Sequence, residues 1–204
     1  MSAMNIVYRY FDQSQMYINI TNRCTNKCKF CIRYTPTGVE GEDLWLTREP
    51  TVDEIKEELI KEHFEEAKEI VFCGYGEPTL RYDVIVEVSK MIREKNPGAV
   101  IRINTNGHGS RAAGKDITPL FEGLIDELSI SLNAKNAKEY NDICLCTYGE
   151  EGFSEMLDFA AKAKNYVRTV ILSVVDVLSE EDIEECRKIA QGIGVEFRVR
   201  HYIE

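Results

Sequence analysis

Three cysteines, Cys24, Cys28 and Cys31, lie within eight residues of one another in the segment "RCTNKCKFCIR". The polar and basic neighbours make this segment a loop, so three incidental buried thiols are a poor explanation. A structural zinc ion needs four ligands, and the fourth would have to come from Cys73 or His108. A cysteine nucleophile needs only one thiol. An iron–sulfur cube is usually held by four thiolates, so three would leave one iron open to a small molecule.

The composition is that of an ordinary globular chain, with 44% hydrophobic and 29% charged residues in 204. We therefore expect a single domain that covers residues 1–204. No apolar run is long enough for a membrane span, and the first residues lack a secretory signal pattern. The seven cysteines are an odd number, which argues against a disulfide scaffold. These features predict a cytoplasmic protein that does not contact membranes.

The formal net charge is −10. An acidic surface repels nucleic-acid phosphates, so a nucleic-acid partner is not expected. Much of the acidic charge lies on amphipathic helix patterns, where solvation explains it.

Strand and helix patterns alternate along the chain. Residues 6–11 and 16–20 predict a β-hairpin, and later strands are expected near 70–73, 99–107, 127–132, 168–177 and 195–203. Helical patterns occupy 51–69, 83–98, 152–166 and 179–194, and the first has a capping box at Thr51 and Glu54. Counting from residue 16, six strands alternate with helices. This order predicts an α/β fold, a partial and open TIM-like barrel of about (β/α)6 with an N-terminal β-hairpin.

Polar and glycine-rich stretches follow these strands at the carboxyl ends. They are the cysteine segment, residues 74–78, 105–108 and 131–133, and then Asp176 and His201. Because the carboxyl ends of parallel strands meet at one edge of the sheet, the stretches should gather there. The functional site is therefore expected at that edge.

The spacing C-x3-C-x2-C after the first strand resembles that of the radical S-adenosylmethionine (SAM) superfamily. Phe30 stands before the third cysteine, where that family usually has an aromatic residue. The resemblance covers essentially the whole chain. A finer likeness, mostly in residues 16–33 with weaker support from 72–81 and 139–146, is to small radical SAM proteins encoded beside or fused to TatD-type nucleases.

The resemblance implies that Cys24, Cys28 and Cys31 hold a [4Fe–4S] cluster whose open iron binds SAM. The stretch "GYGEP" resembles the family's loop after the second strand, where backbone groups accept the SAM amino group. Glycine suits such a loop because it lets a ligand approach the backbone closely. "NTNG" and "SLNA" resemble the family's next two loops, and "ILSVV" the fifth strand. The implied SAM-binding residues are Phe30, Gly74, Tyr75, Gly76, Glu77, Thr105, Asn106, Ser131, Asn133 and Ser173.

Other residues keep alternative interpretations. His108, Arg200 and His201 are candidates for contact with substrate. Strand alternation sends Arg198 and Arg200 to one face, where they would meet an anionic substrate or pair with acidic helices. Cys144 and Cys146 could be ligands of a second cluster, or Cys144 a substrate-side thiol. No catalytic residue is named.

The function that the resemblance implies is reductive cleavage of SAM to a 5′-deoxyadenosyl radical, which abstracts hydrogen from a substrate. The electron would come from an external one-electron reductant, such as a flavodoxin- or ferredoxin-like protein. The open barrel admits a small molecule or a protein segment as substrate, and in the second case the protein would be an activase. A non-catalytic iron–sulfur or zinc module is the interpretation from another class.

Overall fold

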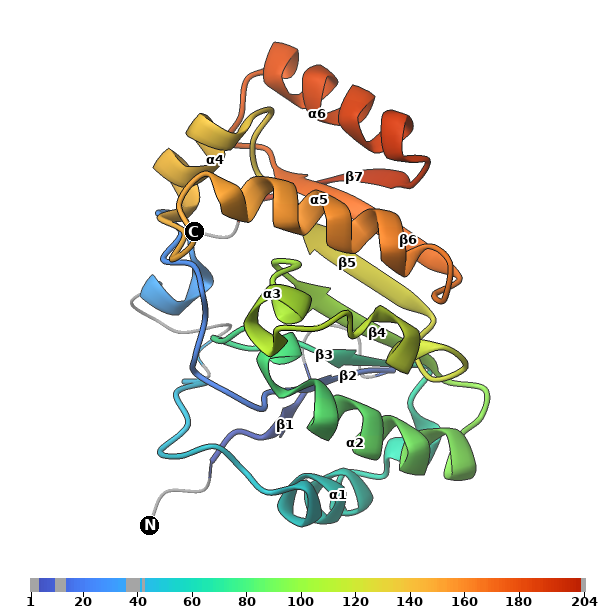
Figure 1. Ribbon diagram of the computed structural model, residues 1–204. Helices are drawn as coiled ribbons and strands as arrows, with labels where there is room; N and C mark the ends of the chain where they lie inside the picture. The colour runs from blue at the N-terminus through green and yellow to red at the C-terminus, as the bar shows by residue number, and fades with distance from the viewer. Residues whose placement is uncertain (1–3, 10–13, 36–40, 42, 203–204) are drawn as a thin grey trace.

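The computed structural model describes residues 4–9, 14–35, 41 and 43–202, and its centre is a seven-stranded sheet (Figure 1). The strands are β1 (Val7–Tyr8), β2 (Gln15–Ile18), β3 (Glu69–Phe72), β4 (Val100–Thr105), β5 (Glu127–Ser131), β6 (Thr169–Val175) and β7 (Glu196–Arg200). They lie in chain order, with β1 antiparallel to β2 and every later pair parallel. β1 and β7 are the two edges, so the barrel is open. The predicted hairpin and six parallel strands are confirmed.

Helices connect the parallel strands. The α-helices are α1 (Val52–Lys61), α2 (Tyr82–Lys95), α3 (Gly109–Ala113), α4 (Ala137–Cys144), α5 (Glu151–Ala163) and α6 (Glu180–Ile193). Short 3-10 turns are η1 (Ile32–Tyr34), η2 (Phe64–Glu66), η3 (Pro78–Arg81) and η4 (Thr118–Phe121). The capping box at Thr51 is confirmed, since Thr51 Oγ1 accepts the Glu54 N–H and Glu54 Oε2 accepts the Thr51 N–H. The sequence analysis did not predict α3 or α4.

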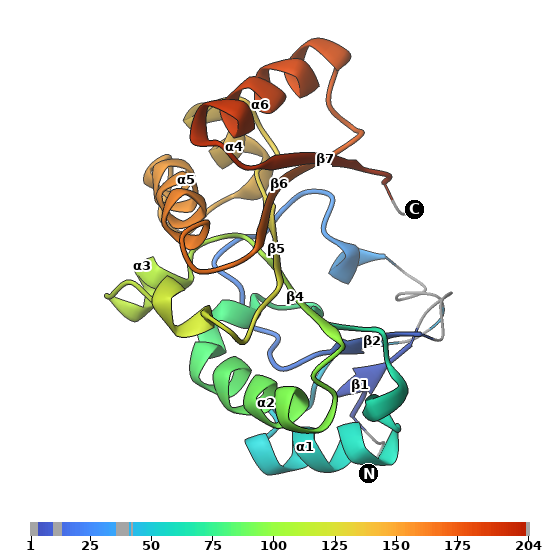
Figure 2. The same cartoon turned by 90° about the vertical axis from the view of Figure 1, so that its right-hand side faces the viewer.

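The two faces of the sheet differ in chemistry because alternate residues of each strand point to opposite sides. In β4, Ile101 and Ile103 are fully buried in the main core cluster, while Arg102 between them is not part of it. Helices cover the apolar face, as Figure 2 shows on the left of the curved sheet. The opposite face, called here the inner face, carries Arg102 and its register partners Val71 and Glu127. No helix in the described part of the chain is long and apolar enough to cross a bilayer.

A small second cluster closes one end of the inner face. Tyr8, Leu44 and Tyr75 are buried together, with Tyr17 and Ile32 packed against them. Asn19, just after β2, donates from Nδ2 to the Leu44 carbonyl over 2.6 Å. The segment around Leu44 therefore packs beside the carboxyl ends of β2 and β3.

Candidate functional site

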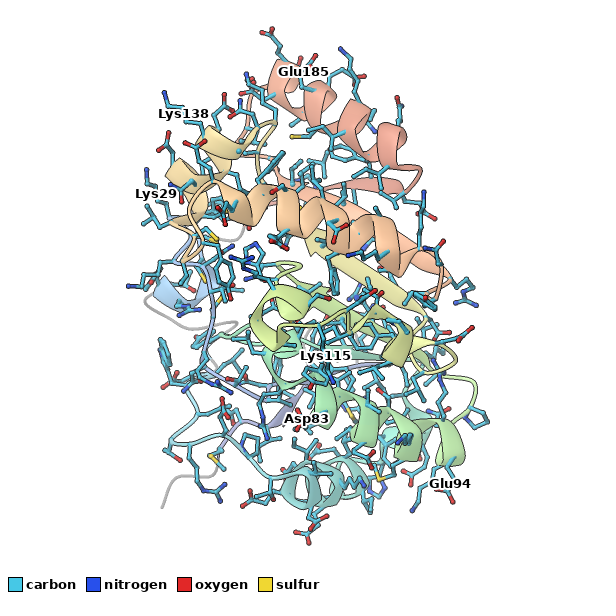
Figure 3. All side chains as sticks on the ribbon, viewed as in Figure 1. Lys29, Asp83, Glu94, Lys115, Lys138 and Glu185 are labelled. Carbon is cyan, nitrogen blue, oxygen red and sulfur yellow. The ribbon has the colours of Figure 1, made fainter. Side chains whose placement is uncertain are left out.

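The cysteine segment follows β2 and lies against the chain that ends α4. Three backbone hydrogen bonds join them: Lys27 N–H to Cys144 O at 2.8 Å, Lys29 N–H to Ile143 O at 3.1 Å, and Thr147 N–H to Thr25 O at 2.8 Å. Lys29 of the cysteine segment and Lys138 of α4 lie on the same side of the molecule (Figure 3). More than a hundred residues of sequence separate the two segments. We call this set of bonds the clasp.

Each of the three thiols has a polar or sulfur-containing side chain beside it. Cys24 Sγ accepts from the Asn26 N–H at 3.4 Å and lies 3.6 Å from Asn106 Nδ2. The neighbouring Cys144 thiol and burial raise the pKa of Cys28. Burial raises the pKa of Cys24 to about 12, so iron must displace its proton on binding.

Arg33 lies near the third thiol. The neighbouring Cys31 sulfur raises the pKa of Arg33 against the opposing effect of burial. The Arg33 guanidinium also lies over the Trp45 ring, 5.9 Å from the ring centroid. Hydrogen bonds and charge near the thiolates are among the levers that tune an iron–sulfur cluster.

The cysteine segment offers three thiolate donors, which is the kind of donor that an iron–sulfur cube uses. In the described part of the chain, no three His, Cys, Asp or Glu side chains converge as the ligands of one metal ion would. Ligation of a cluster by Cys24, Cys28 and Cys31 stays a prediction.

Unpaired polar atoms gather at the same place. Seven buried side-chain nitrogens or oxygens among the described residues have no hydrogen-bond partner. Five of them lie in the cysteine segment or at the carboxyl ends of strands: Asn19 Oδ1, Asn26 Oδ1, Arg33 Nε, Asn133 Oδ1 and Arg200 Nε. Buried polar atoms are usually paired, so such a concentration indicates that a polar ligand completes the bonding there.

Glu77 joins two of the predicted loops. Its Oε1 accepts from Thr79 N at 2.9 Å, Thr79 Oγ1 at 2.5 Å and Thr105 Oγ1 at 2.6 Å, and its Oε2 accepts from Asn106 N at 2.6 Å. Burial raises the pKa of this carboxyl, although the four donors oppose that shift. Glu77 and Thr105 were expected to bind SAM directly, but here the carboxylate and the hydroxyl hold the loops after β3 and β4 together.

Gly74 and Gly76 leave no room for a side chain because protein atoms lie close to their backbone. A Cβ at Gly76 would lie 2.7 Å from the Arg23 carbonyl oxygen and still closer to that of Thr21. A Cβ at Gly74 would overlap the side chain of Asn19. The backbone that approaches the glycines is therefore that of the cysteine segment. Contact of SAM with Gly74 and Gly76 stays a prediction.

Both ring nitrogens of His108 have partners within the protein. The residue is fully buried, with Nδ1 2.9 Å from Thr25 Oγ1 and Nε2 2.9 Å from the Gly152 carbonyl. The carbonyl can only accept, so Nε2 carries the proton and Nδ1 accepts from Thr25. Burial lowers the pKa of His108, so the ring is neutral near pH 7. With both nitrogens used, His108 ties the cysteine segment to the start of α5 and has none free for a substrate.

The other candidates for contact with SAM are placed as follows. Ser131 and Ser173 are paired across β5 and β6 on the inner face. Asn133, with a left-handed φ of 58°, donates from Nδ2 toward Cys144 Sγ over 3.7 Å. Tyr75 is buried against the edge of Trp45, and the rings are 5.2 Å apart. Phe30 is half-buried. Their contacts with SAM stay predictions.

Three further residues are placed by the structure. The His201 side chain is almost fully exposed, and its Nδ1 lies 2.8 Å from Asp176 Oδ2. Its contact with substrate stays a prediction. Arg200 lies on the inner face. Cys146 is buried beside α5, where a Cβ on Gly152 would strike its sulfur. Too few thiols gather near Cys144 and Cys146 to support a second cluster.

Sequence reasoning missed several residues that shape the site. Asn26 is buried and donates to the Tyr140 hydroxyl at 3.0 Å. Asn106 was expected among the SAM-binding residues, but its bond from Nδ2 to Thr25 Oγ1, at 2.8 Å, was not. Arg33 was passed over as well. These side chains come together only through the clasp, and no local spacing marks them. A shallow pocket lined by Thr169 and Glu196 lies at the opposite, amino end of the strands, far from these residues.

Comparisons with known proteins agree with this geometry. Residues 18–190 match the family model described as the radical SAM superfamily. The chain is 30% identical over 172 residues to a protein of Methanocaldococcus jannaschii named as a glycyl-radical enzyme activating enzyme, covering 81% of this chain and 64% of that protein. It is 26% identical over 193 residues to a GTP 3′,8-cyclase of Campylobacter curvus, covering 92% of this chain and 55% of the relative. The chain thus spans about half to two thirds of the length of these relatives.

A solved structure shares the fold. A radical SAM methyltransferase from Sphaerobacter thermophilus superposes with a TM-score of 0.61 at 18% identity, over 96% of this chain and 68% of that chain. Members of the matched family are enzymes that use a [4Fe–4S] cluster and SAM. The family model covers most of the chain, and the fold and the donor set fit it. The chain belongs to the radical SAM superfamily.

Proposed function

We propose that this protein binds a [4Fe–4S] cluster through Cys24, Cys28 and Cys31 and cleaves SAM reductively. The cluster and SAM together would supply a 5′-deoxyadenosyl radical that takes a hydrogen atom from a substrate. The observation that carries the proposal is the three-cysteine segment at the carboxyl edge of an open parallel barrel, surrounded by unpaired polar atoms. The electron would come from an external flavodoxin- or ferredoxin-like protein.

The protein's own part in this function is positioning. Asn106 Nδ2 donates toward the Cys24 sulfur, and the Arg33 guanidinium is an electrostatic neighbour of the Cys31 sulfur. The loop that contains Gly76 and Glu77 supports the cysteine segment from the β3 side, since the Glu77 N–H donates to Arg23 O at 2.7 Å. Such support fixes the ligands before a cofactor arrives.

The test uses the whole chain, reconstituted anaerobically with iron and sulfide and reduced with dithionite. We expect an electron paramagnetic resonance (EPR) signal of a [4Fe–4S]⁺ cluster that changes when SAM is added, and formation of 5′-deoxyadenosine with methionine. Cys28→Ala should lose the cluster, whereas Cys186→Ala, at a thiol buried in α6, should keep it. A cluster signal that ignores SAM would favour a non-catalytic iron–sulfur module, and failure to take up iron would refute the proposal.

A second candidate is an activase that generates a radical on a partner protein. It is favoured by the relative named as a glycyl-radical enzyme activating enzyme and by the open edge between β1 and β7. The same reduced protein, incubated with SAM and candidate glycyl-radical enzymes, should then produce an organic radical signal on the partner. The likeness to TatD-associated proteins stays a prediction, and no comparison bears on it.

A further inference from the structure

Three arginines lie on the inner face of the sheet. Arg102 is in register with Val71 on β3 and Glu127 on β5, and Arg198 is in register with Ser173. Arg200 is two residues beyond Arg198 and therefore shares its face. The notable feature of this face is how differently the arginines are paired.

Two of the arginines have carboxylate partners. Arg102 Nε lies 3.4 Å from Glu69 Oε1, and its Nη1 lies 3.8 Å from Glu127 Oε1. Arg198 Nη1 lies 3.2 Å from the same Glu127 oxygen. Both carboxylates are mostly buried, so these contacts are made in a partly dry environment. Glu69 and Glu127 are thus engaged by two of the three arginines.

Arg200 has no such partner in the described part of the chain. Its Nη2 donates to the Ser131 hydroxyl at 3.4 Å, and its buried Nε, like that of Arg102, has no hydrogen-bond partner. Burial lowers the pKa of Arg200, and the thiols of Cys73 and Cys28 are near enough to oppose that shift. Among the described residues, the positive charge of Arg200 thus has no carboxylate partner, and thiols of the chain after β3 and of the cysteine segment are its neighbours. Burying an unpaired charge is unfavourable, so the charge needs a reason other than stability.

We propose that Arg200, with Ser131, forms an anion-binding subsite that takes a carboxylate or phosphate group of a ligand held inside the half-barrel. Guanidinium groups bind both anions through paired N–H donors, and the free Nε provides one of the two parallel bonds. The proposal deepens the proposed function and rests on it, because the ligand would be SAM itself or the molecule that the radical attacks. Both sources share the chemistry of a negatively charged oxygen group.

The first arm measures stability and needs no cofactor. We expect Arg200→Met to raise the unfolding temperature of the cluster-free protein by about 2 °C or more, because the variant removes an unpaired buried charge. The matched control is Arg102→Met on the same face, which should lower it because Glu69 and Glu127 lose their shared partner. If Arg200 has a structural role instead, Arg200→Met would also lower the unfolding temperature. That result would overturn the proposal.

The second arm measures binding to the reconstituted protein. Inorganic phosphate serves as the probe for a separate anionic ligand, and SAM and decarboxylated SAM are compared by their effects on the cluster's EPR signal. If the anionic group belongs to a separate ligand, Arg200→Gln should weaken phosphate binding by about tenfold or more and leave the affinity for SAM unchanged. If the group is the SAM carboxylate, the variant should weaken SAM binding by a similar factor and leave the affinity for decarboxylated SAM unchanged.

Controls separate the two proposals. Arg198→Gln removes the same charge from the neighbouring, paired position and should change each affinity by less than Arg200→Gln does. Arg200→Lys keeps the charge and should retain part of the binding. Unchanged affinities for phosphate and SAM in Arg200→Gln would overturn the anion subsite. A wild-type protein without a cluster or without a SAM response would overturn the proposed function, while the stability comparison would still test Arg200.

Discussion

Replacement of Gly76 by alanine tests how the site is held together. The new Cβ would lie 2.7 Å from the Arg23 carbonyl oxygen and closer to that of Thr21, and real Cβ atoms essentially never come under 3.0 Å. Both obstacles are backbone atoms, so no side-chain rotation relieves the overlap. The loop must move away from the cysteine segment, and the hydrogen bond from Glu77 N to Arg23 O is lost or stretched.

The expected cost follows from these contacts. Overpacking a rigid site costs about 1–3 kcal/mol, and one lost hydrogen bond adds about 1 kcal/mol. For a chain of this size the sum corresponds to a fall of about 5–10 °C in the unfolding temperature. Because the same movement displaces the segment that carries Cys24, the iron bound per chain should also fall.

The assay is thermal unfolding of the cluster-free protein, followed by iron analysis after reconstitution. Gly98→Ala is the control, since a Cβ there meets nothing within 4 Å. Gly74→Ala should lie between the two, because its obstacle is the Asn19 side chain, which can rotate away. If Gly76→Ala unfolds at the temperature of Gly98→Ala and loses only SAM binding, the glycine serves the ligand, and our explanation is wrong.

Three other variants are informative. Cys144→Ala should keep the cluster and its response to SAM, whereas Cys28→Ala should lose both; loss in Cys144→Ala would make Cys144 a ligand. His108→Gln should flatten the pH dependence of unfolding. The pKa of His108 is lowered in the folded wild-type protein, so on acidification the unfolded chain binds a proton first. Wild-type stability should therefore fall as the pH drops below about 6.5. Equal slopes of stability against pH in the wild type and the variant would contradict this. Glu77→Gln should lower the unfolding free energy by about 2 kcal/mol in denaturant titrations, because an amide N–H would face only donors; an unchanged value would mean that the carboxyl is protonated.

Capping motifs and the alternation of apolar and polar residues predicted the fold well, because they depend on residues that are close in the sequence. The capping box at Thr51 and the alternation of Ile101, Arg102 and Ile103 depend only on neighbours in sequence. α4 was missed because it has eight residues, and only two of them, Tyr140 and Cys144, are buried. Two apolar positions four residues apart do not establish a helical period.

The site was predicted in its position but not in its contacts. The order of the loops along the parallel strands placed the cysteines, Glu77 and Asn106 at one edge. The partners of Glu77 could not be read from the sequence, since one of them, Thr105, lies 28 residues away. The role of His108 likewise depends on Gly152, which α5 brings to it from 44 residues along the chain.

The clasp leads to a final expectation about the protein without its cluster. The backbone of Lys27, Lys29 and Thr147 is held by hydrogen bonds that involve only protein atoms. Zinc fingers differ, because their metal ligands are ordered only when metal binds. We therefore expect these three amide hydrogens to exchange slowly in the cluster-free protein. The comparison is hydrogen–deuterium exchange of the same amides before and after reconstitution. Exchange as fast as that of an unstructured peptide would mean that the cluster, and not the clasp, orders the cysteine segment.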